Sequence, residues 1–191
     1  MAKPSEAFVS IVAAQASDDD LVARARNDPC AFADLYDRYL PRVYRYLFSK
    51  VSSQADAEDL TSQVFIAALE AFPRYRHKGH FNAWLFSIAR RKAADHYRRH
   101  ISQAPIEQAR VEEISLHNFL TEVVKQDELR RLADLITKLN EQEQELLRLR
   151  FAARLGFAEI ARLLKRTEGA VKMSLYRLLE QLESQLEAND E

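Results

Sequence analysis

The stretch from Arg74 to His100 combines positive charge with aromatic rings. Between Arg74 and Arg99, eight arginines and lysines accompany a single aspartate, which gives this segment a net charge of +7. Four histidines lie in or beside it, and five aromatic residues are interleaved with the cations: Tyr75, Phe81, Trp84, Phe86 and Tyr97. Unpaired bases stack on aromatic rings while cations hold the phosphate backbone. The composition therefore predicts a surface that binds single-stranded nucleic acid.

Within this stretch, the loop 73–80 is the better candidate for capturing an unstacked base. The rings of Trp84, Phe86 and Tyr97, taken one by one, are expected to pack in a helical core, because a helix of this type needs large inward-facing groups. The residues predicted to contact the single strand are Arg74, Arg76, Lys78, His80, Phe81, Asn82, Trp84, Arg90, Arg91, His96, Arg98 and Arg99.

A second basic segment extends from Arg148 to Arg177. Eight arginines and lysines accompany two glutamates there, for a net charge of +6. The apolar spacing predicts a short helix over 157–164, a four-residue turn, and a longer helix that begins after Thr167 and ends near Leu186. This is the layout of a DNA-binding helix-turn-helix. A purely structural helical hairpin is the alternative.

The two helices of this motif would be held together by Ile160, Ala161 and Leu164 on one side and by Val171 and Leu175 on the other. Side chains that point away from that contact can enter the major groove of duplex DNA. The predicted contacts to bases and phosphates are Arg154, Lys165, Arg166, Thr167, Glu168, Lys172, Ser174 and Arg177.

Helical spacing of apolar residues continues along the chain from Ser17 onward, so the predicted fold class is all-α, with two small helical domains. Residues 1–16 are expected to be a flexible N-terminus. A first domain over 17–100 contains four helices, two of which have capping residues at Ser17 and Ser53. An acidic linker follows over 101–122. The second domain, 123–191, restarts at a capping box of Asn140 and Glu143 and contains the helix-turn-helix.

Two details of the second domain follow from its pattern. Gly156 stands where a helix is expected to end in a left-handed turn, the conformation that glycine adopts most easily. Phe151 is expected in the core with Leu146, Leu147 and Leu149, because all four continue the apolar pattern of one helix.

The composition excludes several classes of protein. Three glycines leave no dinucleotide fingerprint or phosphate-binding loop. No nucleophile–base pair or paired carboxylate is recognisable, so we expect neither enzymatic activity nor a cofactor. The single cysteine fits a reducing compartment, and no segment has the roughly 18 apolar residues that span a bilayer. The expected location is the cytoplasm. The net charge of −1 is the sum of two cationic segments and an acidic remainder.

Three segments resemble, in the same order, motifs of the extracytoplasmic-function (ECF) class of bacterial RNA polymerase sigma factors. The segment 57–65 (AEDLTSQVF) is similar to the part of the family that docks on the polymerase clamp helices. The segment 81–90 (FNAWLFSIAR) is similar to the helix that reads and melts the −10 element. Glu159-Ile160-Ala161 with Ala170-Val171-Lys172 resembles the domain that reads the −35 element. The resemblance covers about residues 18–186.

The resemblance implies a sigma factor that binds the clamp helices and flap of bacterial core RNA polymerase. Its C-terminal domain would read the duplex −35 element, and its N-terminal domain would hold unpaired bases of the −10 element. The linker would thread toward the active site or the RNA exit path. A cognate anti-sigma factor as a further partner is left open. The residues implied to face the polymerase are Asp56, Glu58, Asp59 and Gln63.

Three other interpretations remain open at this stage. A conventional helix-turn-helix regulator with a helical sensor or dimerisation domain would share the C-terminal motif. An adaptor could bind a partner protein through residues 54–65 without contacting DNA. Zinc binding by four histidines, His77, His80, His96 and His100, is disfavoured by the cations around them, and we predict no metal site.

Overall fold

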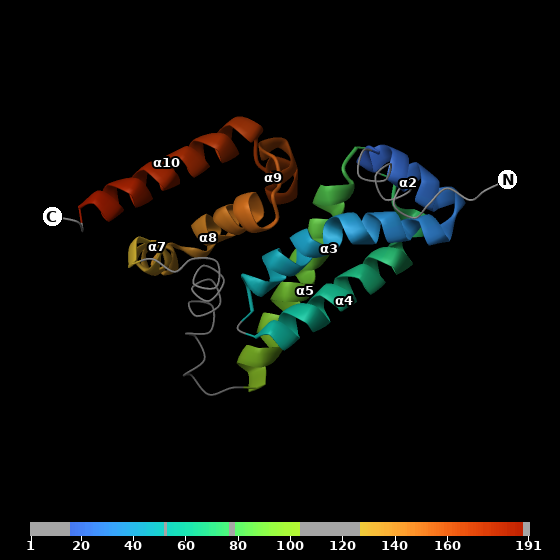
Figure 1. Ribbon diagram of the computed structural model, residues 1–191, viewed down its shortest axis with the longest axis horizontal. Coiled ribbons are helices and arrows are strands. Elements are labelled where there is room, and N and C mark those ends of the chain that lie inside the picture. Colours follow the sequence, from blue (N-terminus) through green and yellow to red (C-terminus); the bar gives the residue numbers. More distant parts are fainter. Residues whose placement is uncertain (1–15, 52, 77–78, 104–126, 189–191) are drawn as a thin grey trace.

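The computed structural model describes residues 16–51, 53–76, 79–103 and 127–188. Every regular element in these ranges is a helix, and the helices form an N-terminal domain and a C-terminal domain that pack against each other (Figure 1). The predicted all-α fold is confirmed. Within the described ranges, no helix is both long and apolar enough to cross a membrane. The predicted flexible N-terminus, apart from Ala16, and most of the predicted linker lie outside the described residues.

Two helices of the N-terminal domain, α2 and α4, begin at serines that cap them. The Ser17 hydroxyl accepts a bond from the Asp20 amide at 3.1 Å, and the Asp20 carboxylate accepts one from the Ser17 amide at 3.2 Å, which completes a capping box. The Ser53 hydroxyl accepts from the Asp56 amide at 3.0 Å. The elements are α2 (Asp18–Asn27), η1 (Pro29–Ala31), α3 (Phe32–Phe48), α4 (Gln54–Ala71), η2 (Phe72–Arg74) and α5 (Phe81–Gln103).

The N-terminal core is built around α3, whose apolar stripe faces α4 and α5. Tyr39 and Tyr46 are fully buried and pack edge-on against Phe81 and Phe86, with ring centroids 5.3 Å and 5.6 Å apart. Such aromatic pairs add about 0.5–1.5 kcal/mol each beyond the burial of their area. The helix α5 is therefore fixed to α3 by its aromatic residues.

The C-terminal domain follows the predicted order of elements. Asn140 caps its helix by accepting from the Glu143 amide at 3.0 Å, and Glu143 accepts from the Asn140 amide at 3.1 Å. The predicted capping box is confirmed. The elements are α7 (Asp127–Thr137), α8 (Glu141–Leu147), the π-helical turn η4 (Arg148–Ala152), α9 (Phe157–Leu164) and α10 (Glu168–Glu187).

The turn η4 corrects two expectations from the sequence. The Ala153 amide bonds to the Arg148 carbonyl five residues earlier, at 2.9 Å, so the helix widens before it ends. Phe151 then points outward and is 53% exposed, so the prediction that it lies in the core is wrong. The left-handed residue is Arg154, at φ 54°, and not Gly156. Gly156 is extended, at φ −73° and ψ 163°, and caps α9.

Candidate nucleic-acid and polymerase interfaces

The helix-turn-helix is formed by α9 and α10 and is held by a short polar turn. Lys165 ends α9 in the left-handed conformation, at φ 55° and ψ 44°, and the Arg166 amide bonds to the Ala161 carbonyl at 2.8 Å. Thr167 accepts from the Ala170 amide at 3.2 Å and caps α10, as predicted. Residues 165–167 separate the helices, so the turn is one residue shorter than predicted.

The face of α10 that the sequence assigned to duplex DNA is open to solvent. The side chains of Ile160, Val171 and Leu175 are buried between the helices, as the motif requires. Arg166 lies along α10 and donates to the Ser174 hydroxyl at 2.7 Å, and Ser174 is half-buried. The exposed members of the predicted set are Arg154, Lys165, Arg166, Thr167, Glu168, Lys172 and Arg177.

Two apolar side chains on the same helix were missed by the sequence analysis. Met173 is 52% exposed and Tyr176 is 50% exposed, and the Lys172 ammonium lies 5.7 Å from the centre of the Tyr176 ring. Lys172 and Tyr176 are four residues apart, which places both on one helix face. This spacing could have identified the contact between Lys172 and Tyr176.

The aromatic residues of α5 divide between core and surface. Phe81 is 2% exposed and packs against Tyr39, Tyr75 and Trp84, so its ring belongs to the core and is not available to a base. Trp84 is half-buried, with its ring centre 4.8 Å from that of Tyr75. Tyr97 is exposed, in contrast to the core position expected for it.

The cations of the first basic stretch are mostly at the surface. Arg76 donates to the Pro73 carbonyl at 2.7 Å, and Arg98 pairs with Asp95 on the same helix. His96 lies 3.6 Å from the Asp56 carboxylate. The exposed members of the predicted set are Arg74, Arg76, Arg91, Arg98 and Arg99. Lys78 lies outside the described residues.

Three residues predicted to contact single-stranded DNA contact the C-terminal domain instead. The His80 ring nitrogen lies 2.6 Å from the Arg162 guanidinium on α9, and the Asn82 amide donates to the Glu159 carboxylate on the same helix. Arg90 donates to the Glu145 carboxylate on α8 at 2.8 Å. The C-terminal domain therefore covers part of the predicted single-strand surface.

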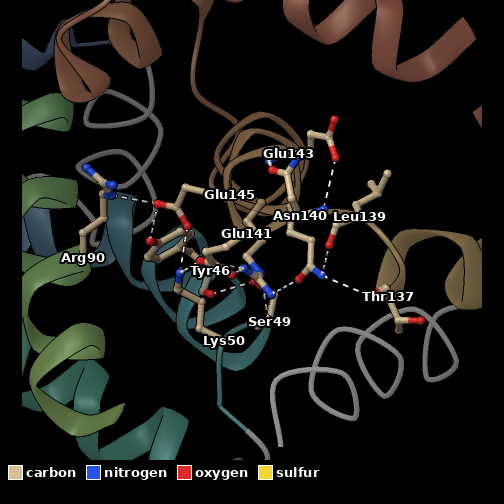
Figure 2. Close-up of polar contacts among 12 residues, drawn as sticks. Tyr46, Ser49, Lys50, Arg90, Thr137, Leu139, Asn140, Glu141, Glu143 and Glu145 are labelled. Carbon is tan, nitrogen blue, oxygen red and sulfur yellow. Dashed lines mark hydrogen bonds and ion pairs between the residues drawn. The ribbon is translucent and has the colours of Figure 1, made fainter. Parts of the chain in front are cut away.

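A buried polar cluster, which we call the joint, lies between the two domains (Figure 2). Its centre is Glu145, only 5% exposed, which accepts from Tyr46 at 2.9 Å and from Lys50 and Arg90 at 2.8 Å. Burial raises the pKa of Glu145, but the two cations and the Tyr46 hydroxyl outweigh that effect and hold the pKa below its ordinary value. Burial, reinforced by Glu145, raises the pKa of Tyr46. The members of the joint are Tyr46, Ser49, Lys50, Arg90, Glu141, Gln144, Glu145 and Arg148.

Arg148 shows that a charged residue in a basic segment is not always at the surface. It is 1% exposed and donates to the Gln144 side chain at 2.6 Å, to Glu141 at 3.1 Å and to the Ser49 carbonyl at 3.2 Å. Its guanidinium thus joins α8 to the end of α3. The sequence counted Arg148 with the DNA-facing charges, whereas the structure places it inside the joint.

The predicted polymerase-facing residues lie on α4. Glu58 and Asp59 are exposed, Gln63 and Asp56 are half-buried, and Gln63 donates to Asp59 at 2.6 Å. The sequence analysis missed two exposed apolar residues on the same helix, Ile66 at 58% and Leu69 at 50%. Their spacing from Asp59 and Ser62 by seven residues, two helical turns, could have revealed them.

No group of three or more histidine, cysteine, aspartate or glutamate residues is placed to hold a metal ion in the part of the chain that the structure describes. Of the four histidines weighed as zinc ligands, the side chains of His77 and His100 lie outside that part.

Comparisons with known proteins match both domains separately. Residues 35–102 match the Sigma-70 region 2 family, and residues 129–182 match the Sigma-70, region 4 family. The chain is 37% identical to the ECF RNA polymerase sigma factor BldN of Streptomyces coelicolor over 170 residues, which are 85% of this chain and 63% of BldN.

A second relative is matched by this chain over almost its whole length. The chain is 32% identical to the ECF RNA polymerase sigma factor ShbA of Streptomyces griseus over 174 residues, which are 85% of this chain and 91% of ShbA. The fold is also that of CnrH, solved in complex with the cytosolic domain of CnrY, with a TM-score of 0.65, 24% identity, and coverage of 90% of this chain and 97% of CnrH. The two matching regions, their order and the similarity to ShbA over most of both chains agree, and the chain belongs to the ECF family of RNA polymerase sigma factors, which direct promoter-specific transcription initiation.

Proposed function

We propose that this chain binds core RNA polymerase and directs it to promoters by reading the −35 element with α10 and the −10 element with the α5 region. The observation that carries the proposal is that two cationic surfaces lie on separate domains. The acidic helix α4 belongs to neither of these surfaces. The first domain matches sigma-70 region 2 and the second matches region 4.

At the −35 element, α10 would lie in the major groove, with Lys172 and the Thr167 end of the helix toward the bases. Glu168 would accept from a cytosine amino group, which is the usual partner of a carboxylate there. Arg154, Lys165 and Arg177 would hold phosphates and fix the register. Ser174 and Arg166 bond to each other, so we assign them one shared contact.

At the −10 element, the surface cations Arg74, Arg76, Arg91, Arg98 and Arg99 would hold the backbone of the unpaired strand. Trp84, half-buried beside the loop 73–80, remains a candidate platform for a base. His80, Asn82, Arg90 and His96 complete the set, and Lys78 is retained on its sequence position. We leave Phe81 out because its ring packs in the core.

On the polymerase side, Asp56, Glu58, Asp59 and Gln63 would face basic side chains of the clamp helices. The exposed Ile66 and Leu69 on α4 would add apolar contact area beside them. A mixed acidic and apolar face of this kind suits a protein partner better than DNA, because DNA repels carboxylates.

Several further assignments belong to the same proposal. The domain boundaries would be residues 17–100 and 123–191, with the acidic linker 101–122 between them. The chain would act in the cytoplasm, without catalytic activity of its own. We also include an anti-sigma protein among the proposed partners, because CnrH was solved in complex with the cytosolic domain of CnrY.

Run-off transcription with core polymerase and genomic fragments tests the proposal, together with co-purification of the chain and core enzyme. We expect transcripts from a defined class of promoters. Asp59→Arg should abolish co-purification while the circular dichroism spectrum stays unchanged, because the reversed charge would face basic polymerase side chains.

Glu183→Arg, the same charge change at an exposed position of α10, is the matched control and should co-purify normally. Native binding by Asp59→Arg would reject the docking face. DNA binding and repression without any association with core polymerase would instead favour the conventional helix-turn-helix regulator.

A further inference from the structure

The first helix, α2, has no role in the proposed function so far, yet it binds both sides of the loop 73–80. It lies beside the start of α5, at one end of the N-terminal domain (Figure 1). The Asp19 carboxylate accepts a hydrogen bond from the Gly79 amide at 2.7 Å, and the Arg26 guanidinium donates to the Tyr75 carbonyl at 2.7 Å. One helix therefore holds the backbone of the loop near its beginning and near its end.

The spacing of these two contacts is set by the geometry of α2. Asp19 and Arg26 are seven residues apart, which is two turns, so both side chains lie on the same face of the helix. Two turns of an α-helix span about 10 Å along its axis. The two contacts thus hold Gly79 and Tyr75 at positions that a rigid helix determines.

The helix α2 is itself fixed on α3. The Asp18 carboxylate accepts from the Arg38 guanidinium at 2.9 Å and from the Tyr39 hydroxyl, and Arg24 forms an ion pair with Asp34 at 2.8 Å. The residues of α2 that are buried in the core are Leu21, Val22 and Ala25. The contacts to the loop therefore start from a helix that cannot move independently of the domain.

The loop contains a residue for which such support matters. Gly79 has φ 71°, in the left-handed region that glycine adopts most easily. Glycine also loses more conformational freedom than any other residue when it is held in one conformation. The hydrogen bond from its amide to Asp19 stabilises this conformation directly before α5 begins.

At the other side of the loop, Arg26 acts on the proposed base platform. Its guanidinium lies 5.9 Å from the centre of the Tyr75 ring, in addition to its bond to the Tyr75 carbonyl. The Tyr75 ring is 3% exposed, and its centre lies 4.8 Å from that of Trp84. The position of Arg26 thus determines how Tyr75 supports Trp84.

We propose that Asp19 and Arg26 are positioning residues for the −10 element: by holding both sides of the loop 73–80, they make the site beside Trp84 selective for one unpaired base over the others. The inference rests on the proposed function for the identity of the ligand. The contacts of α2 with the loop are independent of that function.

The physical reason is that a site fixed before binding discriminates better than a mobile one. Ordering a residue of the backbone costs about 1–2 kcal/mol, and a loop that is already ordered avoids this cost when the base binds. A base of the wrong shape then has to break the contacts with α2 in order to fit. Without these contacts, the loop would adapt to each base and the difference between bases would fall.

The test uses the full chain bound to core polymerase. The probe is a fluorescent single-stranded oligonucleotide with the non-template −10 sequence of a promoter found by run-off transcription, together with versions in which each base is replaced in turn. Fluorescence anisotropy gives the dissociation constants. The measured quantity is their ratio between the disfavoured and the preferred base at the most selective position.

Four variants separate positioning from other roles. Asp19→Ala and Arg26→Ala each remove one contact with the loop, whereas Asp19→Asn keeps an oxygen that can accept from the Gly79 amide. Arg24→Ala removes another exposed arginine of α2, and it is the matched control for Arg26→Ala. Circular dichroism checks that each variant is folded, and if one of the two loop variants fails to fold, the other decides.

We expect each of the two loop variants to lower the ratio about fivefold, which is the effect of losing one net hydrogen bond. Asp19→Asn and Arg24→Ala should keep the ratio of the wild type. Co-purification with core polymerase should be unchanged in all four variants, because α2 lies outside the proposed polymerase face on α4.

Three results would overturn the proposal. A wild-type ratio in both loop variants would show that α2 does not position the site. An equal loss of affinity for all bases, with an unchanged ratio, would assign Arg26 a direct contact with phosphate, and this loss would depend on salt. A loss in Asp19→Asn as large as that in Asp19→Ala would show that the charge of Asp19 acts and not its hydrogen bond. If the wild type itself does not bind core polymerase or does not distinguish bases, the proposed function fails, and this inference fails with it.

Discussion

The two cationic surfaces differ in what lies on them. On α10, Lys172 and Arg177 are exposed. On α5, Arg90 and Asn82 bond to glutamates of the other domain. The surface suited to duplex DNA is available in the free chain, whereas the surface suited to an unpaired strand is partly occupied. This difference matches the order in which a promoter would be engaged, as a duplex first and as a melted strand later.

The largest expected effect separates a buried arginine from an exposed one. Arg148→Ala leaves Gln144, Glu141 and the Ser49 carbonyl without their shared donor inside the joint. Each buried polar group left without its partner costs about 1–3 kcal/mol, whereas the Glu141 side chain, which is 50% exposed, stays in contact with water. Urea denaturation should show this loss of stability for Arg148→Ala and a change within about 0.5 kcal/mol for Arg177→Ala, which is exposed on α10. Equal effects would remove the structural distinction between the two regions.

A smaller effect tests whether α10 is the surface that reads duplex DNA. Lys172→Ala should weaken binding to a duplex −35 fragment from an identified promoter about tenfold, the typical cost of one base contact. The contact between the two domains should be unchanged, because Lys172 lies outside the joint. Fluorescence anisotropy at a fixed salt concentration measures the affinity. Arg91→Ala, which removes an exposed cation from α5, is the matched control and should bind the same duplex normally. A loss of similar size for both variants would mean that the two surfaces are not specialised.

The smallest expected effect is the dependence of the contact between the two domains on pH. The pKa of Glu145 lies below its ordinary value of 4.5 while the two domains are in contact. A lowered pKa stabilises the contact between the domains at pH values above the ordinary pKa, and this contribution is lost as the pH falls through the lowered pKa. The charged and titratable groups around Glu145 are Tyr46 and Lys50 at the end of α3, Arg90 on α5, and Glu141 and Arg148 beside it.

Small-angle X-ray scattering between pH 7 and pH 3.5 provides the measurement. The wild type should expand below about pH 4.5 while its circular dichroism remains helical, and Glu145→Gln should show no such step in that range. A wild-type radius of gyration that stays constant until the helices unfold would remove Glu145 from the centre of the joint.

The sequence predicted the elements that depend on near neighbours. Ser17, Asn140 and Thr167 cap their helices because each bonds to an amide three residues ahead, and such bonds are visible as spacing. The helix-turn-helix was found for the same reason, since Ile160 and Val171 belong to one local packing unit. These features needed no knowledge of the rest of the chain.

The errors concern residues whose positions depend on distant contacts. In the sequence, Arg148 cannot be distinguished from the surface cations around it. Its burial is explained by its hydrogen bond to the Ser49 carbonyl of the other domain. Phe81 lies in a helix that carries many cations, yet its neighbours Tyr39 and Tyr75 place it in the core. Phe151 follows an apolar helical pattern that the wide turn η4 interrupts. Neither a contact between domains nor one additional residue in a turn can be recognised from the local spacing of apolar residues.

The joint connects two parts of a single polypeptide, and this affects how strong it needs to be. A covalent connection turns association into an intramolecular event, governed by an effective local concentration and unaffected by dilution of the protein. Contacts too weak to hold two separate molecules together can then keep the two domains of most chains in contact. The fraction of molecules whose domains are in contact would also remain the same whether a cell makes few or many copies of the factor.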